Sequence, residues 1–257
     1  MAIVVVGGHS RSVGKTSVAA AIIARLPQMR WTAFKITQFG HGFCTANGEP
    51  CDCQTDEHTV AVSEERQPHS GQDGSGTDSG RYLAAGAVRS FWVRSRIGNL
   101  AAAMPRLRKE LAAAENAIIE SNSIMGFLRP DLYLSVLDHA TADFKDSARL
   151  FLDRADALLV HAGAEDLMPH WRGVSPRLTQ GIPRFPIAPP EYMSDAVIAF
   201  SDGFHEPART MRSPSAIRRM AARTRPMAWS ATSSWLTPGE WLTFSPRSLA
   251  HARSTPS

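Results

Sequence analysis

The feature that most constrains this chain is a glycine-rich turn between an apolar run and a helical stretch near the N-terminus. Residues 3–6 are Ile-Val-Val-Val, the composition of a strand buried on both faces, and residues 17–26 have the composition of a helix. The turn between them ends in Gly14-Lys15-Thr16. A turn of this kind points backbone N–H groups at a phosphate, and the N-terminus of the helix that follows favours negative charge. The order therefore predicts a phosphate-binding loop.

The loop is one residue longer than the usual one. Five residues separate Gly8 from Gly14, and His9 stands where a glycine is expected. Lys15 is expected to reach the β- and γ-phosphates of a nucleoside triphosphate, and the Thr16 hydroxyl is expected to bind Mg²⁺. The residues expected to bind the nucleotide here are Gly8, Ser10, Ser12, Val13, Gly14, Lys15, Thr16 and Ser17.

The longer loop resembles that of dethiobiotin synthetase, the cobyrinic acid amide synthases and related members of the signal-recognition/MinD class of P-loop proteins. The resemblance implies that the chain uses ATP or GTP with Mg²⁺. The residues alone leave the base open, because the apolar segment 155–160 leads into His161-Ala162-Gly163-Ala164 and not into a guanine-reading Asn-Lys-x-Asp.

Apolar segments alternate with helical ones along the first 160 residues. The expected strands are residues 3–6, 31–36, 88–93, 117–123, 131–138 and 155–160, and the expected helices include 99–114 and 145–154. Residues 40–76 are expected to form insertion loops, and residues 180–200 a closing loop and helix. This alternation predicts an α/β fold with a parallel, helix-covered sheet of the P-loop NTPase type.

Composition suggests a nucleotide-binding domain at residues 1–204 and a separate tail at 205–257. The tail is rich in Pro, Ser and Arg and has no helical or alternating periodicity, so it is expected to be disordered. A contact with an acidic partner and a reading-frame artefact are the alternatives. The tail carries eight Arg and no Lys against two Glu, which leaves the body of this +4 chain at net −2. That balance argues against nucleic-acid binding by the body.

Neither a membrane span nor a secretory signal is expected. The sequence contains no run of 18 apolar residues, and its first residues lead directly into the apolar strand. The expected location is therefore the cytoplasm.

Two further charged residues lie at predicted strand ends, where open α/β sheets bind ligands. Lys35 closes the second apolar segment and is expected to contact phosphate or substrate, like the lysine of the Lys-Pro-x-x-Thr stretch that this segment resembles in dethiobiotin synthetase. Glu120 follows a buried apolar run, where P-loop proteins place the carboxylate that holds Mg²⁺ or its water. We predict that Lys15, Lys35 and Glu120 are catalytic, and that Thr16 and Glu120 bind Mg²⁺.

Residues 77–87 closely resemble the Lys-Asp-Ser/Thr-x-Arg-x-x-x-Ala-Gly-Ala segment of the molybdopterin-guanine dinucleotide biosynthesis adapter family. Thr77 or Asp78 can cap a helix here. The resemblance assigns Asp78 and Arg81 to the nucleotide site, while Thr77 replaces the family's lysine and Ser121 replaces a glycine after the matching Glu120. It implies GTP binding with slow hydrolysis at most, a homodimer, and a protein partner in molybdenum cofactor biosynthesis.

All three cysteines lie within ten residues, in a Cys-x6-Cys-x-Cys-x4-His pattern. Clustered thiols beside histidine in a cytosolic chain indicate metal or redox chemistry. Cys44, Cys51 and Cys53 with His58, or with His41, are predicted to bind Zn²⁺ or an iron–sulfur cluster. A redox pair at Cys51 and Cys53, or incidental thiols, are the alternatives.

Three functions remain open on the sequence. The first is a GTP-binding adapter with weak hydrolysis. The second is an ATP-dependent ligase like dethiobiotin synthetase or cobyrinic acid amide synthase, in which Lys15 and Lys35 neutralise developing charge. The third is a metal-binding regulatory switch that uses nucleotide to change shape.

Overall fold

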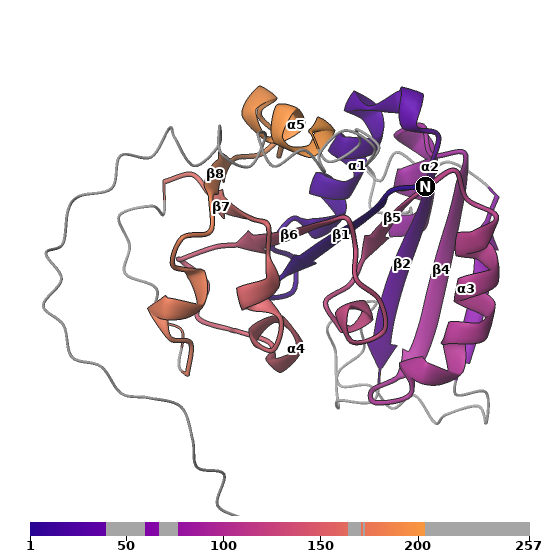
Figure 1. The fold of residues 1–257 in the computed structure, drawn as a ribbon, viewed down its shortest axis with the longest axis horizontal. Coiled ribbons are helices and arrows are strands. Elements are labelled where there is room, and N and C mark those ends of the chain that lie inside the picture. Colours follow the sequence, from indigo (N-terminus) through magenta and orange to yellow (C-terminus); the bar gives the residue numbers. More distant parts are fainter. Residues whose placement is uncertain (40–59, 67–76, 164–170, 172, 204–257) are drawn as a thin grey trace, which may run out of the picture. The chain divides into compact units, whose positions relative to one another are not determined.

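The computed structural model describes residues 1–39, 60–66, 77–163, 171 and 173–203, all within the compact unit Met1–Pro207. Eight strands form one sheet in the order β3-β4-β2-β5-β1-β6-β7-β8, and every neighbouring pair is parallel except β3 with β4 (Figure 1). The strands are β1 (Ile3–Gly8), β2 (Trp31–Phe39), β3 (Val60–Glu65), β4 (Arg89–Arg96), β5 (Asn116–Glu120), β6 (Leu132–Leu137), β7 (Ala157–His161) and β8 (Arg184–Ile187). The predicted α/β fold is confirmed.

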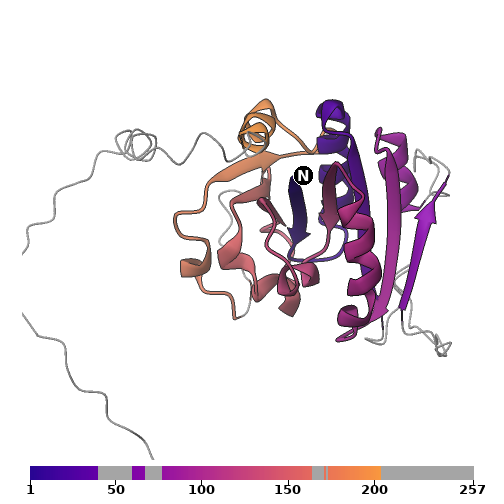
Figure 2. The ribbon, with the colours of Figure 1, turned by 45° about the vertical axis from the view of Figure 1, so that its right-hand side comes forward.

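Helices cover both faces of this sheet (Figures 1 and 2). Helices α1 (Lys15–Arg25), α2 (Asp78–Ala84) and α5 (Asp195–Asp202) contribute to the hydrophobic core on one face, and α3 (Met104–Ala112) contributes to the core on the other. A fifth helix, α4 (Asp146–Arg149), is a single turn after β6. The parallel strands end at one edge, so the loops that follow β1, β2 and β5 lie near one another.

Strand β1 and helix α1 form where the sequence predicts them. Val4, Val5 and Val6 are fully buried between β5 and β6, as expected for a central strand of a helix-covered sheet. Helix α1 buries Val18, Ala19, Ile22 and Ile23, spaced three and four residues apart, against the face of the sheet that holds Val4 and Val6. Burying a valine or isoleucine side chain stabilises the fold by roughly 1.5–3 kcal/mol, so this packing holds the phosphate loop between two fixed elements.

The structure corrects several expected boundaries. Residues 60–65 are not loop but the antiparallel edge strand β3, and β8 is a strand within the expected closing segment. The expected helix at 145–154 is one turn of α-helix followed by a 3₁₀ turn at Leu152–Arg154. The expected helix at 99–114 begins with a 3₁₀ turn at Leu100–Ala103. The predictions for the cysteines, His41, His58 and the 205–257 tail fall outside the described residues.

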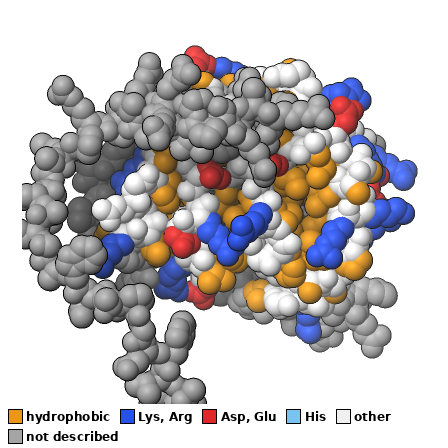
Figure 3. Space-filling model, viewed as in Figure 1, with side chains coloured by type: hydrophobic (Ala, Val, Ile, Leu, Met, Phe, Trp, Pro, Cys, Tyr) orange, Lys and Arg blue, Asp and Glu red, His pale blue; other side chains and the backbone are white. Residues whose placement is uncertain are grey.

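The outer side of α3 is polar, with Arg106, Arg108 and Lys109 exposed. Several Lys and Arg side chains lie on the right-hand side of the surface in Figure 3, the side on which Figure 1 places α3. Within the described part of the chain, no helix combines the length and apolar character that crossing a membrane requires.

Candidate nucleotide site

The phosphate loop runs from the end of β1 to the start of α1. Gly14 precedes the helix with φ +92°, a left-handed conformation that favours glycine. A Cβ at Gly14 would lie 2.5 Å from Cε1 of Tyr192, which packs over the loop. Glycine is therefore required here both by backbone conformation and by the close approach of an aromatic ring.

His9, the residue that lengthens the loop, is fully buried and anchors it to the chain after β6. Its Nε2 accepts the Asp138 N–H at 3.0 Å, so the neutral ring carries its proton on Nδ1, which donates to the Asp143 carbonyl at 2.7 Å. Burial lowers the pKa of His9, in keeping with a neutral ring. The His9 carbonyl also accepts the Lys145 N–H at 2.8 Å.

Asn122 holds the other side of the loop. Its side-chain amide donates to the Gly8 carbonyl at 2.9 Å and its Oδ1 accepts the Gly8 N–H at 2.9 Å. This pair of hydrogen bonds copies a strand ladder, and it ties the end of β1 to the chain just after β5. These bonds fix the backbone of the loop, and a preorganised loop loses less conformational entropy when it binds a ligand.

Lys15 lies at the start of α1 with its Nζ donating to the Ser10 carbonyl at 2.6 Å. Burial lowers the pKa of Lys15 to about 8, and Lys145 and Lys35 add to that effect, while Glu120 opposes it. A half-buried ammonium with a lowered pKa is poorly compensated by negative charge, and a phosphate group would stabilise its charged form.

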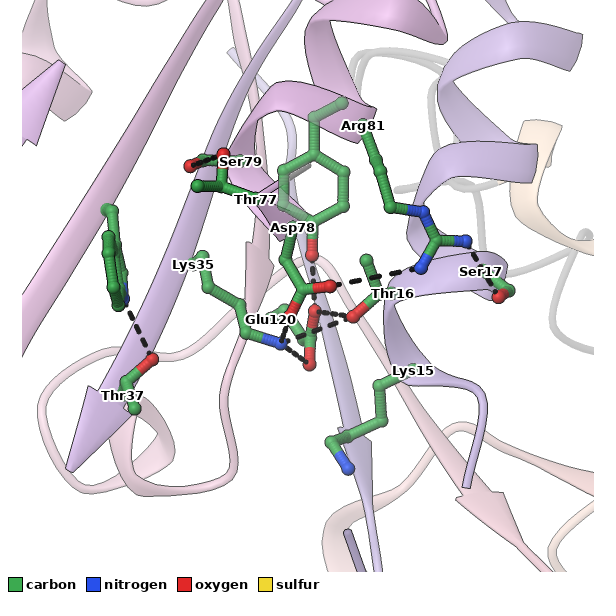
Figure 4. Close-up of polar contacts among 12 residues, drawn as sticks. Lys15, Thr16, Ser17, Lys35, Thr37, Thr77, Asp78, Ser79, Arg81 and Glu120 are labelled. Carbon is green, nitrogen blue, oxygen red and sulfur yellow. Dashed lines mark hydrogen bonds and ion pairs between the residues drawn. The ribbon is translucent and has the colours of Figure 1, made fainter. Parts of the chain in front are cut away.

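Glu120, at the end of β5, is the centre of the polar network drawn in Figure 4. Its Oε2 accepts the Thr16 hydroxyl at 2.8 Å and the Tyr82 hydroxyl, and its Oε1 accepts Lys35 Nζ at 2.5 Å. Burial alone would raise the pKa of Glu120, but Lys35 and Lys15 outweigh it and the pKa is lowered. The carboxylate is therefore charged, buried and aimed at the first turn of α1.

Helix α2 brings Asp78 and Arg81 to the same place. The Thr77 hydroxyl accepts the Gly80 N–H at 3.0 Å, so Thr77 is the N-cap. Asp78 Oδ2 lies 2.8 Å from Lys35 Nζ, and Arg81 donates to the Ser17 hydroxyl at 3.2 Å. The residues predicted from separate motifs are thus brought together by three elements, β2, α2 and β5, around the start of α1.

One pocket of about 1170 Å³ joins these groups. It is lined by Ser12, Gly14, Lys15, Thr16, Ser17, Lys35, Asp78, Arg81 and Glu120, all predicted from the sequence. The other three predicted residues do not line the pocket: Val13 packs in the core, Ser10 is buried, and Gly8 is held by Asn122. Five cationic side chains and three carboxylates line the pocket, a balance that favours an anionic ligand.

Several lining or supporting residues escaped the sequence analysis. Tyr82 lies four residues after Asp78 on one helix face, a spacing that could have suggested it. Asn122, Lys145 and Tyr192 reach the loop from segments without a recognisable motif. Trp92 also lines the pocket, and its indole N–H donates to the Thr37 hydroxyl at 3.0 Å.

The donors around Thr16 suit a magnesium ion. A hydroxyl and two carboxylates are hard oxygen ligands of the kind that Mg²⁺ takes alongside phosphate oxygens. Among the described residues, this site included, no group of three or more His, Cys, Asp or Glu side chains could hold a metal. The predicted cysteine site stays a prediction, because Cys44, Cys51, Cys53 and His58 lie outside those ranges.

Three features decide the class of the site. A glycine-rich loop joins β1 of a central, mostly parallel sheet to α1, a lysine and a threonine open that helix, and a buried acid ends the adjacent strand β5. The chain has a P-loop nucleotide-binding fold. No protein-family model matches the sequence, and no curated protein matches it.

Among solved structures, the P-loop chain is similar to HypB from Helicobacter pylori in complex with nickel, at 12% identity and a TM-score of 0.40, over 88% of this chain and 91% of that one. It is also similar to the "apo" form of LpxK from Aquifex aeolicus in complex with ATP, at 15% identity and a TM-score of 0.37. That match covers 72% of this chain and 53% of LpxK. The assignment of the fold rests on the chain's own strand order and loop.

Proposed function

We propose that this protein binds a nucleoside triphosphate with Mg²⁺, GTP in preference to ATP, and hydrolyses it slowly. The observation that supports this most is the network that joins Thr16 of the loop to Glu120 and Lys35, beside the lysine of the phosphate loop. The preference for GTP and the slow rate follow from the resemblance to the adapter family of molybdenum cofactor guanylylation. The same resemblance supports a homodimer, a protein partner in that biosynthesis and a cytoplasmic location.

Each group has a defined task in this proposal. Lys15 holds the terminal phosphates through a charge-assisted hydrogen bond. Thr16, Glu120 and Asp78 hold Mg²⁺, which supplies neutralisation of the phosphate charge when bound. Arg81, next to Ser17 at the first turn of α1, is placed to contact phosphate oxygens. Phosphoryl transfer depends mainly on such positioning and charge stabilisation.

Calorimetric titration with GTP and with ATP, each in Mg²⁺, tests the binding and the preference. Glu120→Gln should lower hydrolysis more than binding, because it removes charge near the metal and keeps the shape of the side chain. Wild-type hydrolysis in Glu120→Gln would mean that Glu120 is not the carboxylate on the metal side. If the protein binds neither GTP nor ATP, the proposal is rejected.

The second candidate function is an ATP-dependent ligase that activates a carboxylate or carbamate. It is favoured by the extension of the pocket past Lys35 to Thr37, Gln38 and Trp92, which lie beyond the phosphate loop. The volume of about 1170 Å³ exceeds the roughly 300–1,000 Å³ usual for one small ligand. A substrate acid that accelerates ATP turnover many-fold would favour this ligase over the adapter, whose turnover is independent of such a substrate.

A further inference from the structure

The ammonium of Lys35 lies among three oxygens that also form the proposed metal site. Lys35 Nζ is 2.5 Å from Glu120 Oε1, 2.8 Å from Asp78 Oδ2 and 3.2 Å from Thr16 Oγ1. An ammonium has three N–H donors, so these contacts can use all of them. The lysine side chain is 17% exposed and that of Glu120 is 3% exposed, which makes this a largely desolvated cluster. Figure 4 shows the lysine and Asp78 converging on Glu120 from two different elements.

A magnesium ion and this ammonium cannot use the oxygens together. Mg²⁺ binds oxygen ligands at roughly 2.0–2.1 Å, so an ion on Thr16 and the two carboxylates would occupy the volume that Lys35 Nζ fills. Two cations at such a separation also repel strongly in a site shielded from water. One cation therefore has to leave when the other enters.

The neighbouring pocket offers Lys35 a second position. The lysine lines the same cavity as Lys15, and its stem of four flexible carbons allows the ammonium to move while β2 stays paired with β4 and β5. The terminal phosphates proposed to bind beside Lys15 would supply the negative charge that the ammonium gives up.

We propose that Lys35 is an exchangeable internal cation: its ammonium neutralises Glu120 and Asp78 until a magnesium–nucleotide complex arrives, and then moves to the terminal phosphates. The exchange makes metal binding depend on nucleotide, since each ligand favours the same position of one side chain, and such coupling is reciprocal. This inference rests on the proposed function, and it adds that Lys35 suppresses divalent-cation binding in the absence of nucleotide.

The test is a Mn²⁺ titration of the full-length protein without nucleotide, with free Mn²⁺ measured by electron paramagnetic resonance. Lys35→Met should bind one Mn²⁺ at least tenfold more tightly than the wild type. The double variant K35M/E120Q should lose that gain, because a ligand carboxylate is gone. Lys109→Met, which removes an exposed lysine on α3, should match the wild type.

The variant Lys15→Met distinguishes cation exchange at Lys35 from the general electrostatic effect of removing a nearby positive charge. Lys15 also lowers the pKa of Glu120, but its Nζ bonds the Ser10 carbonyl. Its removal should tighten Mn²⁺ binding less than threefold. An equal gain in Lys15→Met and Lys35→Met, or no gain in Lys35→Met, would overturn the proposal.

A second measurement uses only the wild type, in case Lys35→Met fails to fold. In a crystal structure with Mg²⁺ and a non-hydrolysable triphosphate, Lys35 Nζ should lie beyond hydrogen-bond distance of Glu120 and within it of the terminal phosphate. Lys35 still bonded to Glu120 beside a metal on Thr16 would overturn the exchange while leaving the proposed function intact. Failure of the wild type to bind magnesium–nucleotide in calorimetry would instead reject the proposed function.

Discussion

Lys15 and Lys35 line one pocket and differ in what surrounds them. Burial acts to lower the pKa of each lysine. The pKa of Lys15 falls to about 8, whereas at Lys35 the charges of Glu120 and Asp78 outweigh burial and the pKa is raised. The Lys15 ammonium bonds a backbone carbonyl, and the Lys35 ammonium bonds two carboxylates and a hydroxyl. The comparison teaches that the positive charge of Lys15 is poorly compensated within the protein, whereas that of Lys35, in the middle of β2, is already balanced by two carboxylates.

The largest expected effect comes from removing Lys15, the lysine whose charge is poorly compensated. Lys15→Met should weaken triphosphate binding on the order of 100-fold, because a charge-assisted contact of about 1.5–3 kcal/mol disappears from the phosphate loop. Calorimetry with GTP and ATP in Mg²⁺ measures it, and Lys109→Met is the exposed control. Unchanged affinity for both nucleotides would disprove the assignment of the phosphate loop.

The backbone that presents Lys15 can be tested through two glycines with positive φ. Gly14→Ala should lower the free energy of unfolding by about 2 kcal/mol more than Gly86→Ala, because a Cβ at Gly14 overlaps Tyr192. Gly86, at φ +103°, shows no atom within 4 Å of such a Cβ, so it reports the strain of the backbone alone. Chemical denaturation of both variants gives the difference, and equal losses would mean that Tyr192 yields without cost.

The pKa of Lys15 also predicts a pH dependence of binding. Its ammonium is mostly charged at pH 7 and mostly neutral at pH 9, since the pKa is about 8. A triphosphate prefers the charged form, so affinity should fall about tenfold from pH 7 to pH 9. Lys15→Arg, whose guanidinium stays charged throughout, should flatten the calorimetric profile. A profile equally steep in Lys15→Arg would place the titrating group elsewhere.

The network around Lys35 and Glu120 should tolerate the loss of a single hydrogen-bond donor. Tyr82→Phe removes one hydrogen bond to Glu120 but leaves those from Thr16 and Lys35. We expect the free energy of unfolding to fall by about 1 kcal/mol and triphosphate affinity to change less than twofold. Tyr133→Phe is a buried control, because its hydroxyl makes a longer hydrogen bond of 3.4 Å to Asn122, and it should cost less. Thermal and chemical denaturation measure both losses.

The sequence predicts the parts of this site that lie on strong local patterns. Thr16 follows a recognisable loop, and Glu120 ends an apolar run. Lys35 is expected at a strand end but lies in the middle of β2, where the parallel register pairs it with Glu120. Edge strands give weaker signals: β3 is half polar, and β8 has four residues and contains Pro186. Asn122 and His9 act through hydrogen bonds to chain segments more than a hundred residues away, which local periodicity does not encode.

His9 has a consequence for the length of the loop. Its ring and backbone bond Val136, Asp138, Asp143 and Lys145, so the extra residue works as a cross-brace between the loop and the segment that carries one of the pocket's lysines. Deleting His9 would restore the common spacing of glycines and yet detach that brace. The two loop lengths therefore need different surroundings: the longer loop is held in place by the end of β6 and the chain that follows it.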